Sequence, residues 1–473
     1  MKRKASVLLF AIPALIFLLA LPFTASTVLL SNSNVYEDTY LGGMKLKRDR
    51  LKSLEGKRIV FIGGSSLCFG LRSRLIAKEL KDYEVVNFGL YGGLGSEAML
   101  DLALPHLHEG DIAIISVEQN KQTLSSYFSP REMWKAIDNC KDAFFDLDSQ
   151  DKKQMAADAL SFSSEKSSYL LSGAKAEGDG VYAYSSFNEE GDIEVAEVSS
   201  NIMHRGLDFN HMVSYNFRIV EDSFIDSMNE FAKSAQNKGI STYFWFAPAN
   251  SSAILDNSKI DSFYADLSNA ITFPILGNPH DAIMDSSYFY DTNFHLNNAG
   301  SQNNSRRFVM DMKAELGDVS KTDIELLPPP EAEEEEEKEG NNGDLDCFEI
   351  REIDGEVLLT GLTELGKEKE SIMVPYSYQG KVIHSFFHTL FQGESSIREV
   401  IIQDNIKSIP DGSFAGSKIS RIKILNDSPS TISVGRGLLR GSSANIYVPW
   451  YALSKYRSNY FWSVYSDRLY EFR

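Results

Sequence analysis

Three short apolar runs constrain the fold of this chain more than any other feature. They are RIVFIGG at 58–64, DIAIISV at 111–117 and STYFWFAPAN at 241–250. Each is rich in β-branched or aromatic residues, and each ends in or is followed by glycine or polar residues. Runs of this length and composition predict strands that are buried on both faces, as in a parallel sheet.

Helical patterns lie between these runs, at 72–81, 96–106 and 219–237, and a further short strand is expected at 84–87. Strands that alternate with helices predict an α/β domain, a parallel sheet with helices on both faces, over residues 56–320. Residues 130–215 interrupt the alternation with acidic, serine-rich sequence. We interpret them as an insertion of helices and loops over one end of the sheet.

The N-terminal segment predicts a membrane anchor. Lys2, Arg3 and Lys4 precede an uncharged, mostly apolar run over 5–30. About 20 apolar residues cross a bilayer core of roughly 30 Å, and flanking positive charges stay in the cytoplasm. We therefore expect a single-pass protein of the cell membrane, with a transmembrane helix in 1–30 and the bulk of the chain extracellular. A cleaved signal peptide is the alternative, although no A-x-A site follows the run. Residues 31–55 are polar and predict a stalk.

Composition excludes several classes of function. The formal net charge is −19, which argues against a nucleic-acid partner. The three cysteines, Cys68, Cys140 and Cys347, have neither the spacing of a zinc site nor that of a disulfide framework. Histidine spacing typical of metal sites and a glycine-rich phosphate loop are also missing from the sequence, so we expect no metal and no cofactor.

Residues 321–345 predict an acidic linker, because they contain three consecutive prolines followed by a run of glutamates. Prolines stiffen such a segment, like charges extend it, and nothing in it forms an apolar face. From this composition we expect the C-terminal module, residues 346–473, to fold alone and to reorient freely.

A repeat of 22 residues characterises the C-terminal module. Val400 aligns with Ile422, and Ile402 aligns with Ile424, in short segments of alternating apolar residues. Weaker copies lie at 371–375 and 445–450. A period of 20–29 residues with short strands is typical of leucine-rich repeats, in which each strand packs its apolar residues on the next.

The segment DGSFAGSKI at 411–419 resembles the aromatic turn of BspA-like leucine-rich repeats of bacterial surface proteins. The ending IYVPWYALSKYRSNYFWSVY also resembles the last repeat and capping helix of that family. The resemblance covers about residues 345–473. It implies a binding module whose partner is a protein or a host-surface ligand.

Small and polar residues follow three of the predicted strands, where active sites of open α/β sheets are found. Ser65 and Ser66 follow two glycines directly after the first strand, a placement that exposes a serine nucleophile beside free backbone N–H groups. Gly92 follows the second strand and Asn120 follows the third.

Asp291 and His295 lie in the loop YFYDTNFHLNNAG at 288–300, before a final helix. A neutral histidine beside a serine takes its proton, and a carboxylate orients the ring and stabilises the imidazolium. The four segments together predict a serine nucleophile with a histidine base.

The same segments, in this order, resemble the SGNH/GDSL hydrolases over residues 55–315, above all members that modify bacterial cell-surface polymers. The resemblance implies a flavodoxin-like three-layer fold, a catalytic serine and an Asp–His pair. It also implies an oxyanion site formed by the Gly92 N–H and the Asn120 amide. The first segment reads GGSS rather than GDS, which leaves Ser65 and Ser66 both open, with Ser65 preferred. Glu118 is an alternative to Asn120. Three residues separate Asp291 from His295, where the family usually has two.

From this resemblance we expect an extracellular serine esterase or O-acyltransferase that acts on acyl groups of a cell-wall or exported polysaccharide. Esterase and transferase both remain open, because an acyl-enzyme can react with water or with a sugar hydroxyl. The alternative is a catalytically inactive surface scaffold or adhesion protein that binds through its repeats.

Overall fold

The computed structural model describes residues 33–203, 207, 208, 210–331, 342–353 and 356–472, together with Val28. Its first domain contains a sheet in which every neighbouring pair is parallel, in the order β2-β1-β3-β4-β6. This confirms the predicted α/β class. The strands are β1 (Arg58–Gly63), β2 (Glu84–Gly89), β3 (Ile112–Ser116), β4 (Ser241–Trp245) and β6 (Ile275–Leu276).

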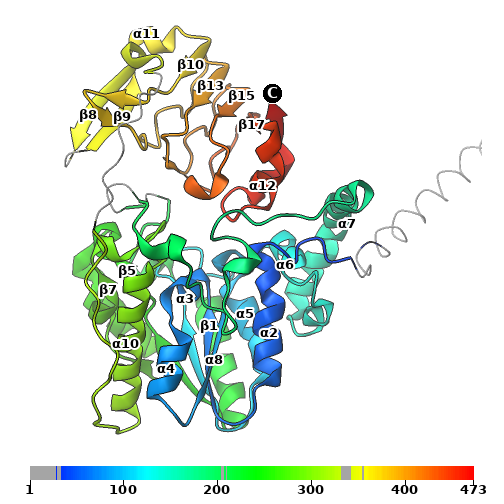
Figure 1. The fold of residues 1–473 in the computed structure, drawn as a ribbon, viewed down its shortest axis with the longest axis vertical. Coiled ribbons are helices and arrows are strands. Elements are labelled where there is room, and N and C mark those ends of the chain that lie inside the picture. Colours follow the sequence, from blue (N-terminus) through cyan, green and yellow to red (C-terminus); the bar gives the residue numbers. More distant parts are fainter. Residues whose placement is uncertain are drawn as a thin grey trace, which may run out of the picture.

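Helices cover both faces of this sheet (Figure 1). Side chains alternate along β1, so Val60 and Ile62 join one apolar cluster while Ile59 and Phe61 join another. The first cluster includes residues of α2 (Gly43–Ser53), α5 (Ser96–Ala103), α8 (Asp222–Asn237) and α9 (Ile260–Ala270). The second includes residues of α4 (Ser73–Glu79) and α10 (Asn298–Glu315).

Residues predicted to form a stalk at 31–55 are instead part of this domain wherever the structure describes them. Met44 and Leu51 of α2 are fully buried, and the Arg50 guanidinium donates to the Val85 carbonyl of β2. The prediction was wrong because the many polar residues of this segment obscured the pattern of an amphipathic helix with one apolar face. The predicted anchor at 1–30 lies outside the described residues apart from Val28, and no helix in the described part of the chain has the length and apolarity to span a membrane.

The insertion at 130–215 contributes α6 (Pro130–Ala136), α7 (Ser149–Ser172) and an irregular segment. Asp192 of this segment is buried and accepts hydrogen bonds from the Ser73 N–H and hydroxyl and from the Asn87 amide. Through these bonds the insertion is attached to the sheet and to α4.

The C-terminal module contains a second sheet of parallel strands, in the order β10-β13-β15-β17-β18. Val400 pairs with Ile422 and Ile402 with Ile424, the residues that the 22-residue period aligns. The strands are β10 (Ser371–Met373), β13 (Glu399–Ile402), β15 (Arg421–Ile424), β17 (Asn445–Pro449) and β18 (Leu469–Phe472). They follow an antiparallel hairpin of β8 (Phe348–Ile353) and β9 (Glu356–Leu362), and α12 (Leu453–Ser458) precedes β18.

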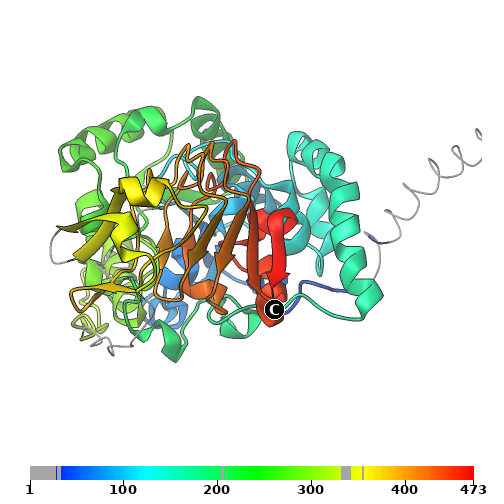
Figure 2. The ribbon, with the colours of Figure 1, turned by 90° about the horizontal axis from the view of Figure 1, so that it is seen from above.

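The C-terminal module lies over the carboxyl ends of the first sheet, with α7 to one side (Figures 1 and 2). Ser433 donates to Asp208 at 3.0 Å, and the Ser430 N–H donates to Asp179 at 3.0 Å. The Asn210 amide donates to Ser433 at 2.8 Å. The expectation of a freely reorienting module was therefore wrong. It was drawn from the composition of the linker, which carries no information on the contacts between the surfaces of the two modules.

The predicted linker at 321–345 also begins later than expected. Ile324 is buried against the α10 face of the sheet, and Asn303 of α10 binds both the N–H and the carbonyl of Leu327. Residues 332–341, which hold most of the glutamates, lie outside the described residues.

At the N-terminus of α7, the carboxylates of Asp148 and Asp151 meet that of Asp101 from α5, with oxygens of all three within 4.8 Å of one another. Asp148 caps the helix by accepting the Asp151 N–H at 2.6 Å. Burial and, secondly, the charge of Asp148 raise the pKa of Asp151 to about 7, and the same two causes raise the pKa of Asp101 to about 6.

We predict that the protein loses stability as pH rises from about 4 to about 7. An unfolded aspartate releases its proton near pH 3.9, whereas folded Asp151 holds it until about pH 7, so the folded state binds more protons across this window. Thermal melting of Asp151→Asn should show a flatter pH dependence, with higher stability than wild type at pH 8. The control is Asp226→Asn, the same change at an exposed residue of α8, which should keep the wild-type slope. Parallel curves for all three proteins would contradict the prediction.

Candidate active site

Two glycines allow the first strand to end close to its neighbour. A Cβ atom on Gly63 would lie 1.8 Å from the Ser116 carbonyl oxygen of β3, and one on Gly64 would lie 2.5 Å from Glu118 Oε1. Ser65 then begins α3 (Ser65–Gly70), so its backbone N–H has no partner within the helix. The sequence GGS thus places the serine at the carboxyl edge of the sheet, between β1 and β3.

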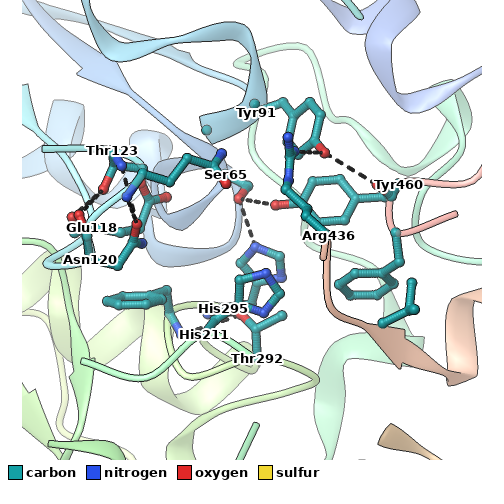
Figure 3. A pocket seen from close by; sticks show the side chains of 16 residues that line it. Ser65, Tyr91, Glu118, Asn120, Thr123, His211, Thr292, His295, Arg436 and Tyr460 are labelled. Carbon is teal, nitrogen blue, oxygen red and sulfur yellow. Dashed lines mark hydrogen bonds between the residues drawn. The ribbon is translucent and has the colours of Figure 1, made fainter. Parts of the chain in front are cut away.

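Ser65, His295 and Asp291 form a continuous hydrogen-bonded chain, of which Figure 3 shows the Ser65–His295 bond. Ser65 Oγ lies 2.8 Å from His295 Nε2, and His295 Nδ1 lies 2.8 Å from Asp291 Oδ1. The imidazole stacks on Phe69 of α3, with ring centroids 4.2 Å apart and planes 7° apart. The extra residue between Asp291 and His295 fits into a turn, in which Thr292 Oγ1 accepts the His295 N–H at 3.1 Å.

The structure brings Ser65, and not Ser66, to the histidine. Ser66 is fully buried, and its hydroxyl has no hydrogen-bond partner within the described residues. The Ser66 N–H donates to Glu118 Oε1 at 3.1 Å.

Gly92, Glu118 and Asn120 line the same cavity as Ser65. Gly92 begins a short 3-10 helix, Gly92–Leu94. Asn120 Oδ1 accepts the backbone N–H groups of Gln122 and Thr123, which leaves the amide N–H2 of Asn120 as the end that can bind an acceptor. The Glu118 carboxylate accepts a hydrogen bond from the Ser66 N–H. The groups that remain for an oxyanion are therefore the Ser65 N–H, the Gly92 N–H and the Asn120 amide.

Tyr182 of the insertion is a site residue that the sequence did not reveal. Its hydroxyl donates to Asp291 Oδ2 and lies 3.1 Å from His295 Nδ1. Burial and the charge of Asp291 raise the pKa of Tyr182 well above its usual range, so the hydroxyl keeps its proton and remains a donor. No local motif marks this tyrosine, because its role depends on a contact across more than a hundred residues.

The C-terminal module also reaches the site. Tyr460 places its hydroxyl 2.9 Å from Ser65 Oγ, and Arg436 donates to the hydroxyls of Tyr91 and Tyr127. With these residues in place, the cavity beside Ser65 has a volume of about 50 Å³. The sequence indicated none of these contacts, since the two modules were expected to move separately.

The arrangement has the chemistry of an acyl-transfer site. A serine hydroxyl that donates to a neutral imidazole is a potential nucleophile, and a carboxylate on the far nitrogen stabilises the imidazolium that forms. Within the described residues, Asp101, Asp148 and Asp151 are the one group of carboxylate, histidine or cysteine side chains close enough together to hold a metal ion, and none of them lines this cavity.

Comparison with known proteins adds no assignment. No protein-family model matches the chain, and a search of curated proteins finds no match to it.

We predict that Tyr182→Phe slows the reaction of Ser65 with a fluorophosphonate probe by about tenfold. That factor corresponds to about 1.4 kcal/mol, slightly below the range for a hydrogen bond to a charged group. The loss should fall on the maximal labelling rate and leave the probe concentration at half-maximal rate unchanged, because Asp291 without this donor orients the His295 ring less well, while Tyr182 does not line the cavity that the probe enters.

The matched control is Tyr215→Phe, which removes the hydroxyl of another buried tyrosine that has no hydrogen-bond partner within the described residues. It should leave both the maximal labelling rate and the half-maximal probe concentration unchanged. A maximal labelling rate of Tyr182→Phe equal to that of wild type would show that Tyr182 has no role in positioning Asp291.

Proposed function

We propose that this protein is a serine esterase or O-acyltransferase of the SGNH/GDSL type, with a flavodoxin-like three-layer catalytic domain. The observation that supports the proposal is the chain from Ser65 through His295 to Asp291, with both distances 2.8 Å. It lies at the carboxyl edge between β1 and β3, where the strand order of the sheet reverses and where α/β domains bind ligands.

In the proposed reaction, Ser65 Oγ attacks the carbonyl carbon of an ester while His295 Nε2 takes the serine proton. The carbonyl oxygen becomes an oxyanion, stabilised by the N–H groups of Ser65 and Gly92 and by the Asn120 amide. The C–O bond to the leaving group then breaks, and the imidazolium returns the proton to the leaving alkoxide. Asp291 holds the ring in the correct tautomer throughout.

The acyl-enzyme then reacts with a second nucleophile. His295 removes a proton from water in an esterase, or from a sugar hydroxyl in a transferase, and the new oxygen attacks the acyl carbon. The bond to Ser65 Oγ then breaks, and the imidazolium returns the proton to Ser65. We propose that the substrate is an O-acyl group on a cell-wall or exported polysaccharide. The N-terminal segment would anchor the chain in the cell membrane, with both modules outside, and BspA-like leucine-rich repeats would bind a wall polymer or a surface ligand.

A second function, that of an inactive surface scaffold, is favoured by one observation. The hydroxyl of Tyr460 is in contact with Ser65, and Ser65 is only 3% exposed. In a scaffold of this kind the serine would be unreactive, and the surface of the repeats would carry the function.

Two adjacent serines offer a matched test of the enzymatic proposal. We predict that Ser65→Ala lowers hydrolysis of p-nitrophenyl acetate and of acetylated polysaccharide by about a thousandfold or more. Ser66→Ala should keep a rate close to that of wild type, because its hydroxyl makes no hydrogen bond within the described residues. Mass spectrometry after fluorophosphonate treatment should find the label on Ser65. Equal activity in both variants would reject Ser65 as the nucleophile, and an unreactive Ser65 in every variant would favour the scaffold.

A further inference from the structure

Two consecutive aromatic residues of the C-terminal module, Tyr460 and Phe461, enter the space above the candidate nucleophile, and we call them the C-terminal wedge. The Tyr460 hydroxyl lies 2.9 Å from Ser65 Oγ. Its ring centroid is 4.3 Å from that of Tyr91 and 4.8 Å from that of Tyr182, while Phe461 meets Tyr182 edge-on at 5.7 Å. The wedge therefore packs between Tyr91, which follows β2 of the α/β domain, and Tyr182 of the insertion.

The wedge is fixed to its own module. The next residue, Trp462, is fully buried, and its indole N–H donates to the Ile432 carbonyl at 3.2 Å. Tyr456 packs edge-on against this indole at 5.1 Å and donates to the Asn426 carbonyl at 2.9 Å. Because these contacts hold the wedge within its own module, a movement of the whole module would take the wedge away from Ser65.

With the wedge in place, the site is too small for the proposed substrate. Ser65 and His295 are 3% and 2% exposed, and the cavity beside them measures about 50 Å³. Pockets that hold a small organic ligand measure about 300–1,000 Å³. We propose that the C-terminal module inhibits the enzyme by holding the wedge on Ser65, and that the site opens to a polymer when the module separates. This inference rests on the proposed esterase or transferase function.

The position of the Tyr460 hydroxyl explains how the wedge would inhibit. The Ser65 hydroxyl donates its hydrogen bond to neutral His295, so the Tyr460 hydroxyl must donate its hydrogen bond to a lone pair of Ser65 Oγ. Attack on an ester requires that lone pair. Burial and, secondly, Tyr91 raise the pKa of Tyr460 well above its usual range, which keeps this donor protonated. A carbonyl carbon must approach to about 3–3.5 Å of Oγ, and the phenol oxygen occupies part of that shell.

The contacts that hold the module in place include many polar ones. Arg436 donates to Tyr91 and Tyr127, and Ser433 and Ser430 bind Asp208 and Asp179. Polar groups regain hydrogen bonds to water when such a contact opens, so each contributes little net stability. Relative motion is the default expectation for polar interfaces between domains of one chain.

A reversible covalent lock tests the inference on the full chain. A Cβ atom on Gly180 would lie 3.8 Å from the Cβ of Ser430, which matches the mean Cβ–Cβ separation of about 3.8 Å in disulfides. The double variant Gly180→Cys, Ser430→Cys should therefore join the insertion to the C-terminal module. The native thiols of Cys68, Cys140 and Cys347 are all buried. Backbone strain at Gly180, where φ is +54°, is present in the oxidised and the reduced forms alike.

We expect the oxidised variant to react with a fluorophosphonate probe, and to deacetylate polysaccharide, at least tenfold more slowly than the same protein reduced with dithiothreitol. The single variant Ser430→Cys, with and without dithiothreitol, is the control and should show no difference. Equal rates in the locked and reduced forms would overturn the inference, since a locked module would then leave Ser65 accessible.

Two changes at Tyr460 separate this inference from the proposed function. Tyr460→Ala removes the wedge's contact and should raise the labelling rate at least tenfold over wild type. If wild type is labelled and Tyr460→Ala is labelled no faster, the wedge does not inhibit. If neither protein is labelled although both melt cooperatively, the proposed function itself fails. Tyr460→Phe keeps the ring and should react at least as fast as wild type. A loss of about a hundredfold would instead identify Tyr460 as an oxyanion donor and overturn inhibition.

Discussion

The close approach of β1 to β3 is the constraint on which the candidate site depends. The pairing of Gly63 with Ser116 leaves no room for a side chain at the end of β1, and Gly64 packs against the Glu118 carboxylate. Because β1 is followed by β2 on one side and β3 lies on the other, the chain leaves the sheet in opposite directions at this point. Ser65 therefore begins a helix at the point where the connections after β1 and β3 diverge. There, the His295 side chain from the loop before α10 lies within hydrogen-bond distance of it.

Much of this arrangement could be predicted because its signals are local. Apolar runs indicated β1, β3 and β4, and the residues that follow strands indicated Ser65 and Gly92. The choice between Ser65 and Ser66 depends on which hydroxyl faces the loop before α10, because the side chains of adjacent residues in the first turn of a helix point in different directions. The short pattern at 84–87 and the 22-residue period were also sufficient to indicate β2 and the pairing of β13 with β15.

The remaining features depend on contacts between distant segments. Tyr182 contacts Asp291 across 109 residues, and Tyr460 contacts Ser65 across 395 residues. A serine-rich insertion and a repeat module have no local pattern that marks such a tyrosine. The polar segment before β1 was wrongly predicted to be a stalk for a related reason. Its apolar residues Met44 and Leu51 lie among many charged residues, and yet they define the buried face of α2.

The insertion and the C-terminal module meet at the same point of the site. Tyr182 donates to Asp291, and its ring stacks on Tyr460, which contacts Ser65. The side chain that orients one end of the Asp–His–Ser chain thus supports the side chain that covers the other end. Removal of the wedge would leave the Tyr182 hydroxyl bond to Asp291 intact, because that bond lies within the α/β domain and its insertion. If the module opens as proposed, it would expose a Ser65–His295–Asp291 chain that is already aligned, and no rearrangement of these three side chains would be required.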